Sequence, residues 1–215
     1  MSPALLAATL GALPITYQSA LGFRMSLPEG FTPNAEFMRE PTAAAAPAPA
    51  GAQVLLDSVF TDGKGPAASS FALAVVDAPL VLDNGSTERV AALAIAYLRD
   101  QLSSDVHIEW VEKVPAGPGE ALELAGQVDL DDQERVAQFA FVPFGDRQIV
   151  LTASVPSSRF AILGPAIEKS LASLAFDRPV QPESNRRAAI GATVGALVGL
   201  LVVGVRFFAH RARVS

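Results

Sequence analysis

Hydrophobic and polar residues alternate between Tyr17 and Leu27, which is the period of a β-strand with one buried face. Phe23, Met25 and Leu27 fall on one side of this run, and the turn-forming Pro28-Glu29-Gly30 ends it. We therefore expect a strand here.

Two β-rich runs, residues 53–60 and 70–76, lie on either side of the turn-forming stretch Asp62-Gly63-Lys64-Gly65-Pro66. This arrangement predicts a hairpin. Residues 41–52, just before it, are rich in Pro and Ala and predict a solvated loop within the domain.

Downstream, Asp83-Asn84-Gly85-Ser86 ends the strand pattern and offers Ser86 as a helix N-cap. Apolar residues then recur at helical spacing and predict an amphipathic helix of about four turns. They are Val90, Leu93, Ala94, Tyr97, Leu98 and Leu102.

Four more strands are expected, at residues 106–114, 121–130, 135–144 and 147–155. Their short connections, Gly145-Asp146 among them, require antiparallel neighbours. A last helix is expected to begin near Pro165 and to turn Ile167, Leu171 and Leu174 inward.

The order β-β-β-α-β-β-β-β-α predicts an α+β domain over residues 17–177. We expect one antiparallel sheet of about six to seven strands with two helices packed on it.

The run at 188–208 (AAIGATVGALVGLLVVGVRFF) is apolar, and its first 18 residues carry no charge. About 20 such residues span the hydrocarbon core of a bilayer, so we expect one C-terminal transmembrane helix. A buried helix of a globular core is the alternative. Residues 178–187 would be a linker and 209–215 a basic tail. The flanking charges are Arg186, Arg187, Arg206, Arg211 and Arg213.

Gly191, Gly195 and Gly199 recur every four residues and share one helix face. Small residues at this spacing allow two membrane helices to approach closely, which would give a homodimer. Glycine is also common in membrane helices that have no partner.

The orientation in the membrane has two solutions. Residues 1–16 are apolar and resemble a signal peptide, although they lack a positive n-region. If they act as a signal, the domain is extracytoplasmic and the C-terminus cytoplasmic, which the arginine distribution slightly favours. Otherwise the protein is tail-anchored with a cytoplasmic domain.

Charge and composition narrow the function. Residues 1–185 hold 22 Asp and Glu against 11 Lys and Arg, which argues against nucleic-acid binding. The chain has no cysteine and only two histidines, His107 in an expected strand and His210 in the tail. We expect no catalytic residue, no metal ligand and no cofactor, although a hydrolase built on His107 stays open despite the missing Gly-x-Ser-x-Gly motif.

Weaker motifs have simpler interpretations. The carboxylates Asp129, Asp131, Asp132 and Glu134 lack EF-hand spacing and favour a solvated turn over a calcium site. Gly63-Lys64-Gly65 lacks the flanks of a phosphate loop and predicts a turn. Asn84-Gly85-Ser86 is a formal glycosylation sequon, for which helix capping is a sufficient reason.

Four aromatic residues are expected on central strands, where most aromatics belong to the core. Any exposed part of them could form a groove for a partner. They are Trp110, Phe139, Phe141 and Phe144.

Three stretches carry a family resemblance: Gly22–Phe31 (GFRMSLPEGF), residues 150–156 (VLTASVP) and the helix end Ser173-Leu174-Ala175-Phe176. They resemble PsbP-like domains, a group that includes DcrB-type periplasmic proteins and secretion-effector chaperones. The resemblance covers about residues 17–177 and implies a non-enzymatic binding or assembly fold. It assigns no site residue, and the loop at 41–52 departs from the group's compact pattern.

The leading hypothesis is therefore a membrane-anchored, non-enzymatic accessory domain that binds a protein partner at the cell envelope. The alternatives are a small-ligand or lipid sensor, a hydrolase using His107, and a structural spacer.

Overall fold

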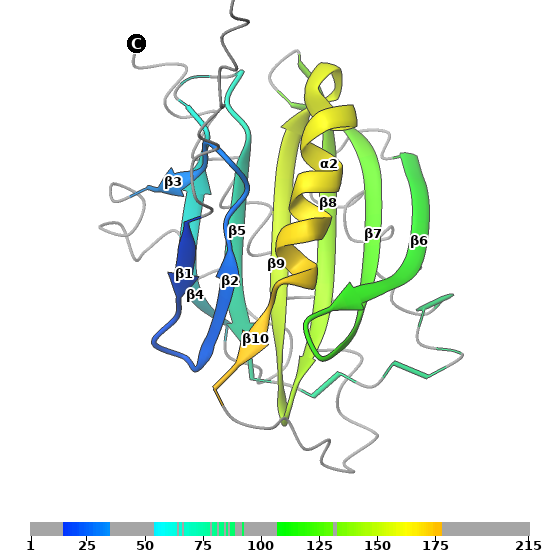
Figure 1. The fold of residues 1–215 in the computed structure, drawn as a ribbon. Coiled ribbons are helices and arrows are strands. Elements are labelled where there is room, and N and C mark those ends of the chain that lie inside the picture. Colours follow the sequence, from blue (N-terminus) through cyan, green and yellow to red (C-terminus); the bar gives the residue numbers. More distant parts are fainter. Residues whose placement is uncertain are drawn as a thin grey trace, which may run out of the picture.

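The computed structural model describes residues 15–34, 54–77 without 64 and 66, a few positions between 79 and 92, and residues 107–130 and 133–177. These residues form two antiparallel sheets and one helix (Figure 1). The larger sheet has the strand order β3-β4-β5-β9-β8-β7-β6, and the smaller one has the order β1-β2-β10. The elements are β1 (Thr16–Gln18), β2 (Phe23–Ser26), β3 (Thr32–Pro33), β4 (Val54–Thr61), β5 (Ser70–Val76), β6 (His107–Ala116), β7 (Gly119–Leu130), β8 (Gln133–Phe144), β9 (Arg147–Pro156), α2 (Ser157–Ala172) and β10 (Ala175–Phe176).

The predicted hairpins are confirmed. β4 pairs with β5, and β6, β7, β8 and β9 form an antiparallel meander. Gly145 has φ 69° at the two-residue turn between β8 and β9, a conformation that glycine adopts without steric cost. Leu130 pairs with Gln133, so β8 begins two residues before position 135, where the strand was expected to begin.

The expectation of a single strand between Tyr17 and Leu27 was wrong. A turn at Ser19–Gly22 divides it into β1 and β2, because Gly22 takes a left-handed φ of 97° and Ser19 Oγ accepts a hydrogen bond from the Leu21 amide at 2.9 Å. The two strands join β10 in a separate small sheet. The antiparallel α+β architecture and the larger sheet of seven strands agree with the prediction, but the fold has a second sheet where only one was expected.

The start of the last helix was also predicted wrongly. α2 begins at Ser157, directly after Pro156 ends β9, and Pro165 lies inside it. A proline within a helix removes one backbone hydrogen bond, and here it does so on the exposed side of α2. Ile167, Leu171 and Leu174 are buried as expected.

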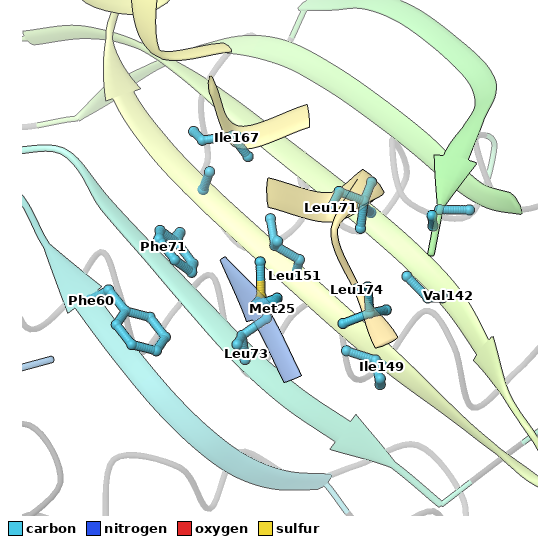
Figure 2. Close-up of a cluster of buried hydrophobic side chains, with 14 of the residues drawn as sticks. Met25, Phe60, Phe71, Leu73, Val142, Ile149, Leu151, Ile167, Leu171 and Leu174 are labelled. Atoms are coloured by element: carbon cyan, nitrogen blue, oxygen red, sulfur yellow. The ribbon is translucent and has the colours of Figure 1, made fainter. Parts of the chain in front are cut away.

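The main core lies between the larger sheet, α2 and the smaller sheet (Figure 2). Leu151 and Leu73 from the sheet meet Leu171 from α2 and Met25 from β2, and all four are at most 2% exposed. Phe60 and Phe71 stack with ring centroids 4.6 Å apart. Side chains therefore fill the helix-side face of the sheet.

The opposite face of the sheet is buried as well. It carries a second apolar cluster that includes Phe139, Phe141, Leu124 and Val150. Phe139 and Phe141 belong to this second cluster and Phe144 to the main core, so all three are core residues, as predicted. Most residues on both faces of β7 and β8 are buried, so a charged side chain within these strands is informative.

Several predictions fall outside the described residues: the segment at 1–14, the loop at 41–52, most of the helix after Ser86, and everything after Asp177 with its glycines and arginines. Thr87, Glu88 and Ala92 are described and are helical. Within the described ranges, no helix is long and apolar enough to cross a membrane.

Candidate functional site: a buried carboxylate beside the edge strand

Within the described part of the chain, three clusters of buried polar side chains interrupt the apolar core. Buried polar groups in folded proteins nearly always have hydrogen-bond partners. A cluster whose atoms are all paired is explained by folding alone, whereas a cluster with unpaired atoms calls for another explanation.

The first cluster joins the smaller sheet to β4 and is fully paired. Tyr17 donates its hydroxyl hydrogen to Asp57 Oδ2 at 2.9 Å, and Ser19 donates to Asp57 Oδ1 at 2.8 Å. Burial and the neighbouring Asp57 carboxylate raise the pKa of Tyr17 to about 12. Burial also raises the pKa of Asp57, while the two hydrogen bonds oppose this effect. The cluster links the smaller sheet to β4 of the larger sheet by two hydrogen bonds.

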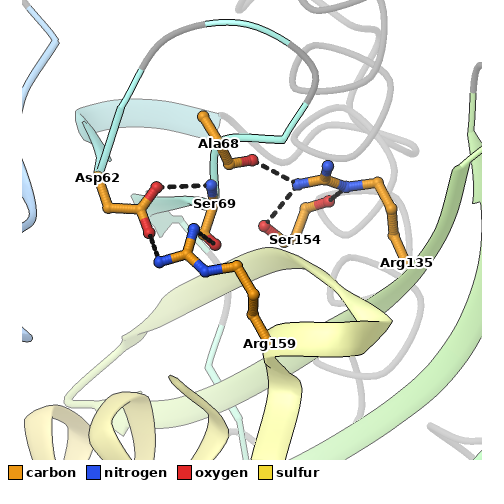
Figure 3. A network of polar contacts seen from close by, with 6 residues as sticks. All are labelled: Asp62, Ala68, Ser69, Arg135, Ser154 and Arg159. Carbon is orange, nitrogen blue, oxygen red and sulfur yellow. Dashed lines mark hydrogen bonds and ion pairs between the residues drawn. The ribbon is translucent and has the colours of Figure 1, made fainter. Parts of the chain in front are cut away.

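The second cluster lies where the β4–β5 connection meets the start of α2 (Figure 3). Arg159 forms an ion pair with Asp62 at 2.7 Å, and Asp62 Oδ1 accepts the Ser69 amide hydrogen at the same distance. Arg135 donates to the Ala68 carbonyl oxygen and to Ser154 Oγ, each at 2.8 Å. This network holds a loop, two strands and a helix together.

The third cluster is centred on Glu123 of β7 and is incompletely paired. Glu123 Oε1 accepts hydrogen bonds from Gln138 Nε2 at 2.9 Å and from Trp110 Nε1 at 3.3 Å. Glu123 Oε2 and Gln138 Oε1 have no hydrogen-bond partner within the described structure, although both residues are only 1% exposed. Two buried acceptors therefore lack a donor.

Negative charge is concentrated around Glu123. Glu112 of β6 lies directly opposite it in the strand register, an arrangement in which like charges repel. Burial is the largest influence that raises the pKa of Glu123, and the charges of Glu168 and Glu112 raise it further. Glu123, Glu112 and Glu168 make no ion pair with a described Lys or Arg.

Two aromatic rings lie beside the carboxylates. The centroids of Trp110 and Phe160 are 5.6 Å apart, and both side chains are partly exposed. The Phe160 ring rests on Gly164, one helical turn along α2, where an added methyl group would come within 3.0–3.3 Å of the ring. Gly164 therefore lets the Phe160 ring lie close to the helix axis.

β6 forms one edge of the larger sheet, and no described strand pairs with its outer side. Trp110 was expected on a central strand and instead lies on this edge, which corrects the prediction. We call Trp110, Glu112, Phe160 and Glu168 the β6–α2 surface.

The other candidate residues are placed as follows. Asp129 and Glu134 pair across the β7–β8 hairpin and are exposed, and Asp131 and Asp132 lie outside the described residues. The His107 backbone belongs to β6, but its side chain is not described, so the hydrolase hypothesis is untested. Among the described residues, no three His, Cys, Asp or Glu side chains form a group that could hold a metal ion.

Sequence patterns do not assemble the Glu123 cluster, but one feature of the sequence points to it. Glu123 is the charged residue in the apolar run from Ala121 to Ala125, and a charge in a run that is apolar on both faces predicts a special environment.

Comparison with known proteins identifies the fold. No protein family and no curated protein matches the sequence. The solution structure of cyanobacterial PsbP (CyanoP) from Synechocystis sp. PCC 6803 matches 81% of this chain and 99% of its own, with a TM-score of 0.52 and 14% identity. The fold is PsbP-like.

Two further solved structures resemble this chain with lower TM-scores. PA94 of Pseudomonas aeruginosa, a protein of unknown function, matches 77% of this chain and 98% of its own at 12% identity, with a TM-score of 0.43. LpqN of Mycobacterium tuberculosis, which is involved in cell envelope biogenesis, matches 77% of this chain and 86% of its own at 11% identity, with a TM-score of 0.40. The similarity to CyanoP confirms the fold implied by the sequence resemblance.

Proposed function

We propose that this chain is a non-enzymatic accessory domain that engages a protein partner at a cell-envelope membrane. The observation that carries the proposal is the β6–α2 surface, where an edge strand lies beside aromatic and carboxylate side chains. Aromatic side chains are enriched at protein interfaces, where they contribute much of the binding energy.

The edge of β6 supports this proposal through its backbone. An edge strand presents unpaired N–H and C=O groups to which a partner strand can add. β6 also carries features that hinder indiscriminate pairing: a bulge between Ile108 and Trp110, the charged Glu109 and Glu112, and Pro115. Such an edge favours a selective partner.

The predicted anchor supports the membrane location. Ten residues, 178–187, lie between Asp177, the last described residue, and the apolar run that begins at residue 188. A linker of this length spans at most about 35 Å, so the domain would work close to the bilayer. We place the domain outside the cytoplasm and the C-terminus inside it, as the apolar residues 1–16 and the arginine distribution favour.

The helix-side packing gives the ligand-sensor alternative no support. A sensor of that kind needs a cavity between the sheet and the helix, and this space is filled by Leu151, Ile167, Leu171 and their neighbours (Figure 2).

Site-directed photocrosslinking in cells that carry the gene tests the proposal. A photoreactive residue at Glu112 or Glu168, both exposed, should give the same crosslinked species in the membrane fraction when placed in the full chain. The residue at Glu29, which is exposed just before β3 at the opposite edge, should give none. Equal crosslinking at all three positions, or none at any, would contradict the partner-binding surface.

The anchor is tested in the same cells. Deleting residues 186–215 should move the protein from the membrane fraction to the soluble fraction, and protease added to intact cells or spheroplasts should digest the domain of the full chain. A truncated protein that stays in the membrane fraction would overturn the anchor. Protection of the domain until lysis would reverse the proposed orientation.

A further inference from the structure

We propose that the partner presents an extended segment with a lysine or arginine, which adds to the β6 edge and places its cation between Glu112 and Glu123. This inference rests on the proposed function and specifies the chemistry of its partner.

The unpaired acceptors are the first argument. Glu123 Oε2 and Gln138 Oε1 both lack a hydrogen-bond donor, and they come from neighbouring strands. An ammonium or guanidinium group carries only donors, three or five of them, so it matches a site of unpaired acceptors. Gln138 is uncharged, so its orphan oxygen is a separate indication from the carboxylate cluster.

Charge is the second argument. Glu112 and Glu123 face each other across β6 and β7 on the side of the sheet that α2 covers, and Glu168 adds a third negative charge from the helix. The described residues supply no cation to this group. A cation from a partner would turn repulsion between two opposed carboxylates into attraction to both.

The aromatic side chains are the third argument. Trp110 is hydrogen-bonded to Glu123 and packs against Phe160, and a cation over an aromatic face is attracted by the ring quadrupole. Trp110 also donates to Glu123 Oε1 at 3.3 Å, the longer of the two hydrogen bonds to that atom. Movement of the Trp110 indole would therefore open the way to Glu123 at the loss of its weaker contact.

The geometry of a sheet sets the route. A strand added to β6 would lie about 4.8 Å from it, with alternate side chains on the α2 side. A long basic side chain opposite Glu112 would reach that exposed carboxylate first and extend toward Glu123 on the next strand. Lysine and arginine are the side chains that combine this length with a positive charge.

Tryptophan fluorescence provides the test, because Trp110 is the only tryptophan in the chain. The probe is a short extended peptide with one central lysine, added to the full chain in a nonionic detergent. The matched control peptide replaces the lysine with norleucine, which keeps the length and removes the charge. The lysine peptide should change the fluorescence saturably, and the norleucine peptide should not.

Two variants locate the binding. Glu112→Gln, at an exposed position, and Glu123→Gln should each weaken binding by about tenfold or more. Glu120→Gln, on the exposed end of β7, should bind like the native chain. Equal binding of both peptides, or unchanged binding to Glu112→Gln, would overturn the inference. If butylammonium alone reproduces the full effect of the peptide, pairing with β6 is refuted.

Failure of this inference can be told apart from failure of the proposed function. If photocrosslinks form at Glu112 and the lysine peptide does not bind, the surface engages a partner of other chemistry. If no crosslinks form, the surface itself is rejected.

Discussion

Replacing Glu123 with glutamine is expected to stabilise the domain at neutral pH. The substitution keeps the shape of the side chain and removes its charge. Its amide nitrogen would take the place of Glu123 Oε2, an atom without a partner, and could donate to Gln138 Oε1, the other orphan. The interactions of Oε1 with Gln138 and Trp110 would remain.

The magnitude follows from the unpaired atoms. A buried polar atom without a partner costs about 1–3 kcal/mol, so pairing it should raise the free energy of unfolding at pH 7 by a similar amount. In a domain of this size each kcal/mol corresponds to a shift of about 2–4 °C in the midpoint of thermal unfolding.

The pH dependence gives the prediction a second readout. Burial raises the pKa of Glu123 above its ordinary value of 4.5, so the folded state holds this proton more tightly than the unfolded state. The free energy of unfolding of the native chain must then fall as the pH rises from about 4.5 through the pKa of the folded state. The advantage of Glu123→Gln should be small near pH 4 and should grow across this window.

Urea denaturation of the full chain in detergent at pH 4, 5.5 and 7 measures both effects, with Glu120→Gln as the exposed control on the same strand. A variant that is less stable than the native chain at pH 7 would refute the reasoning. So would a stability difference that does not change with pH. A stabilised variant that has lost peptide binding would show that Glu123 is kept for binding at the expense of stability.

Three further predictions concern the scaffold, all measured by chemical denaturation. Gly117→Ala should destabilise the domain by about 2 kcal/mol or more, because Gly117 has φ 54° and a methyl group there would clash with the Leu174 carbonyl. Gly119→Ala, whose methyl group would meet no atom within 4 Å, should cost less. Equal costs of the two substitutions would refute the role of Gly117. Asp62→Ala should lower the free energy of unfolding by about 1–3 kcal/mol, because it removes the partner of the Arg159 guanidinium and of the Ser69 amide (Figure 3). Unchanged stability would refute this role of Asp62. The native chain should lose stability between about pH 10 and 12, because the unfolded state releases the Tyr17 phenolic proton in this range and the folded state keeps it. Tyr17→Phe should not show this loss. An unchanged alkaline stability profile would contradict the pKa of about 12.

Local sequence rules were sufficient for the meander from β6 to β9. Each of these strands carries its own alternation, and short turns such as Gly145-Asp146 join neighbours that are also adjacent in the sheet. The pairing of β5 with β9 and the separation of β1, β2 and β10 into a second sheet depend on contacts between residues far apart in the chain. No local pattern encodes these contacts.

Proline and polar residues show the same limit. Pro165 is a strong local signal for a helix start, yet the buried face of Leu163, Ile167 and Leu171 continues through it, and tertiary packing overrides the local preference. The Glu123 cluster draws on three strands and a helix, so no spacing rule could assemble it. Only the unexpected charge in an apolar run pointed to it.

Hydrogen exchange of the full chain in its native membranes, compared with the purified chain in detergent, tests the central claim most directly. If a partner adds to the β6–α2 surface, the amides of β6 should be protected in the membranes and exchange faster after purification, while the β1–β2 amides change little. Equal exchange of β6 in both states, or protection confined to the β1–β2 sheet, would contradict the claim that this edge is where the protein works.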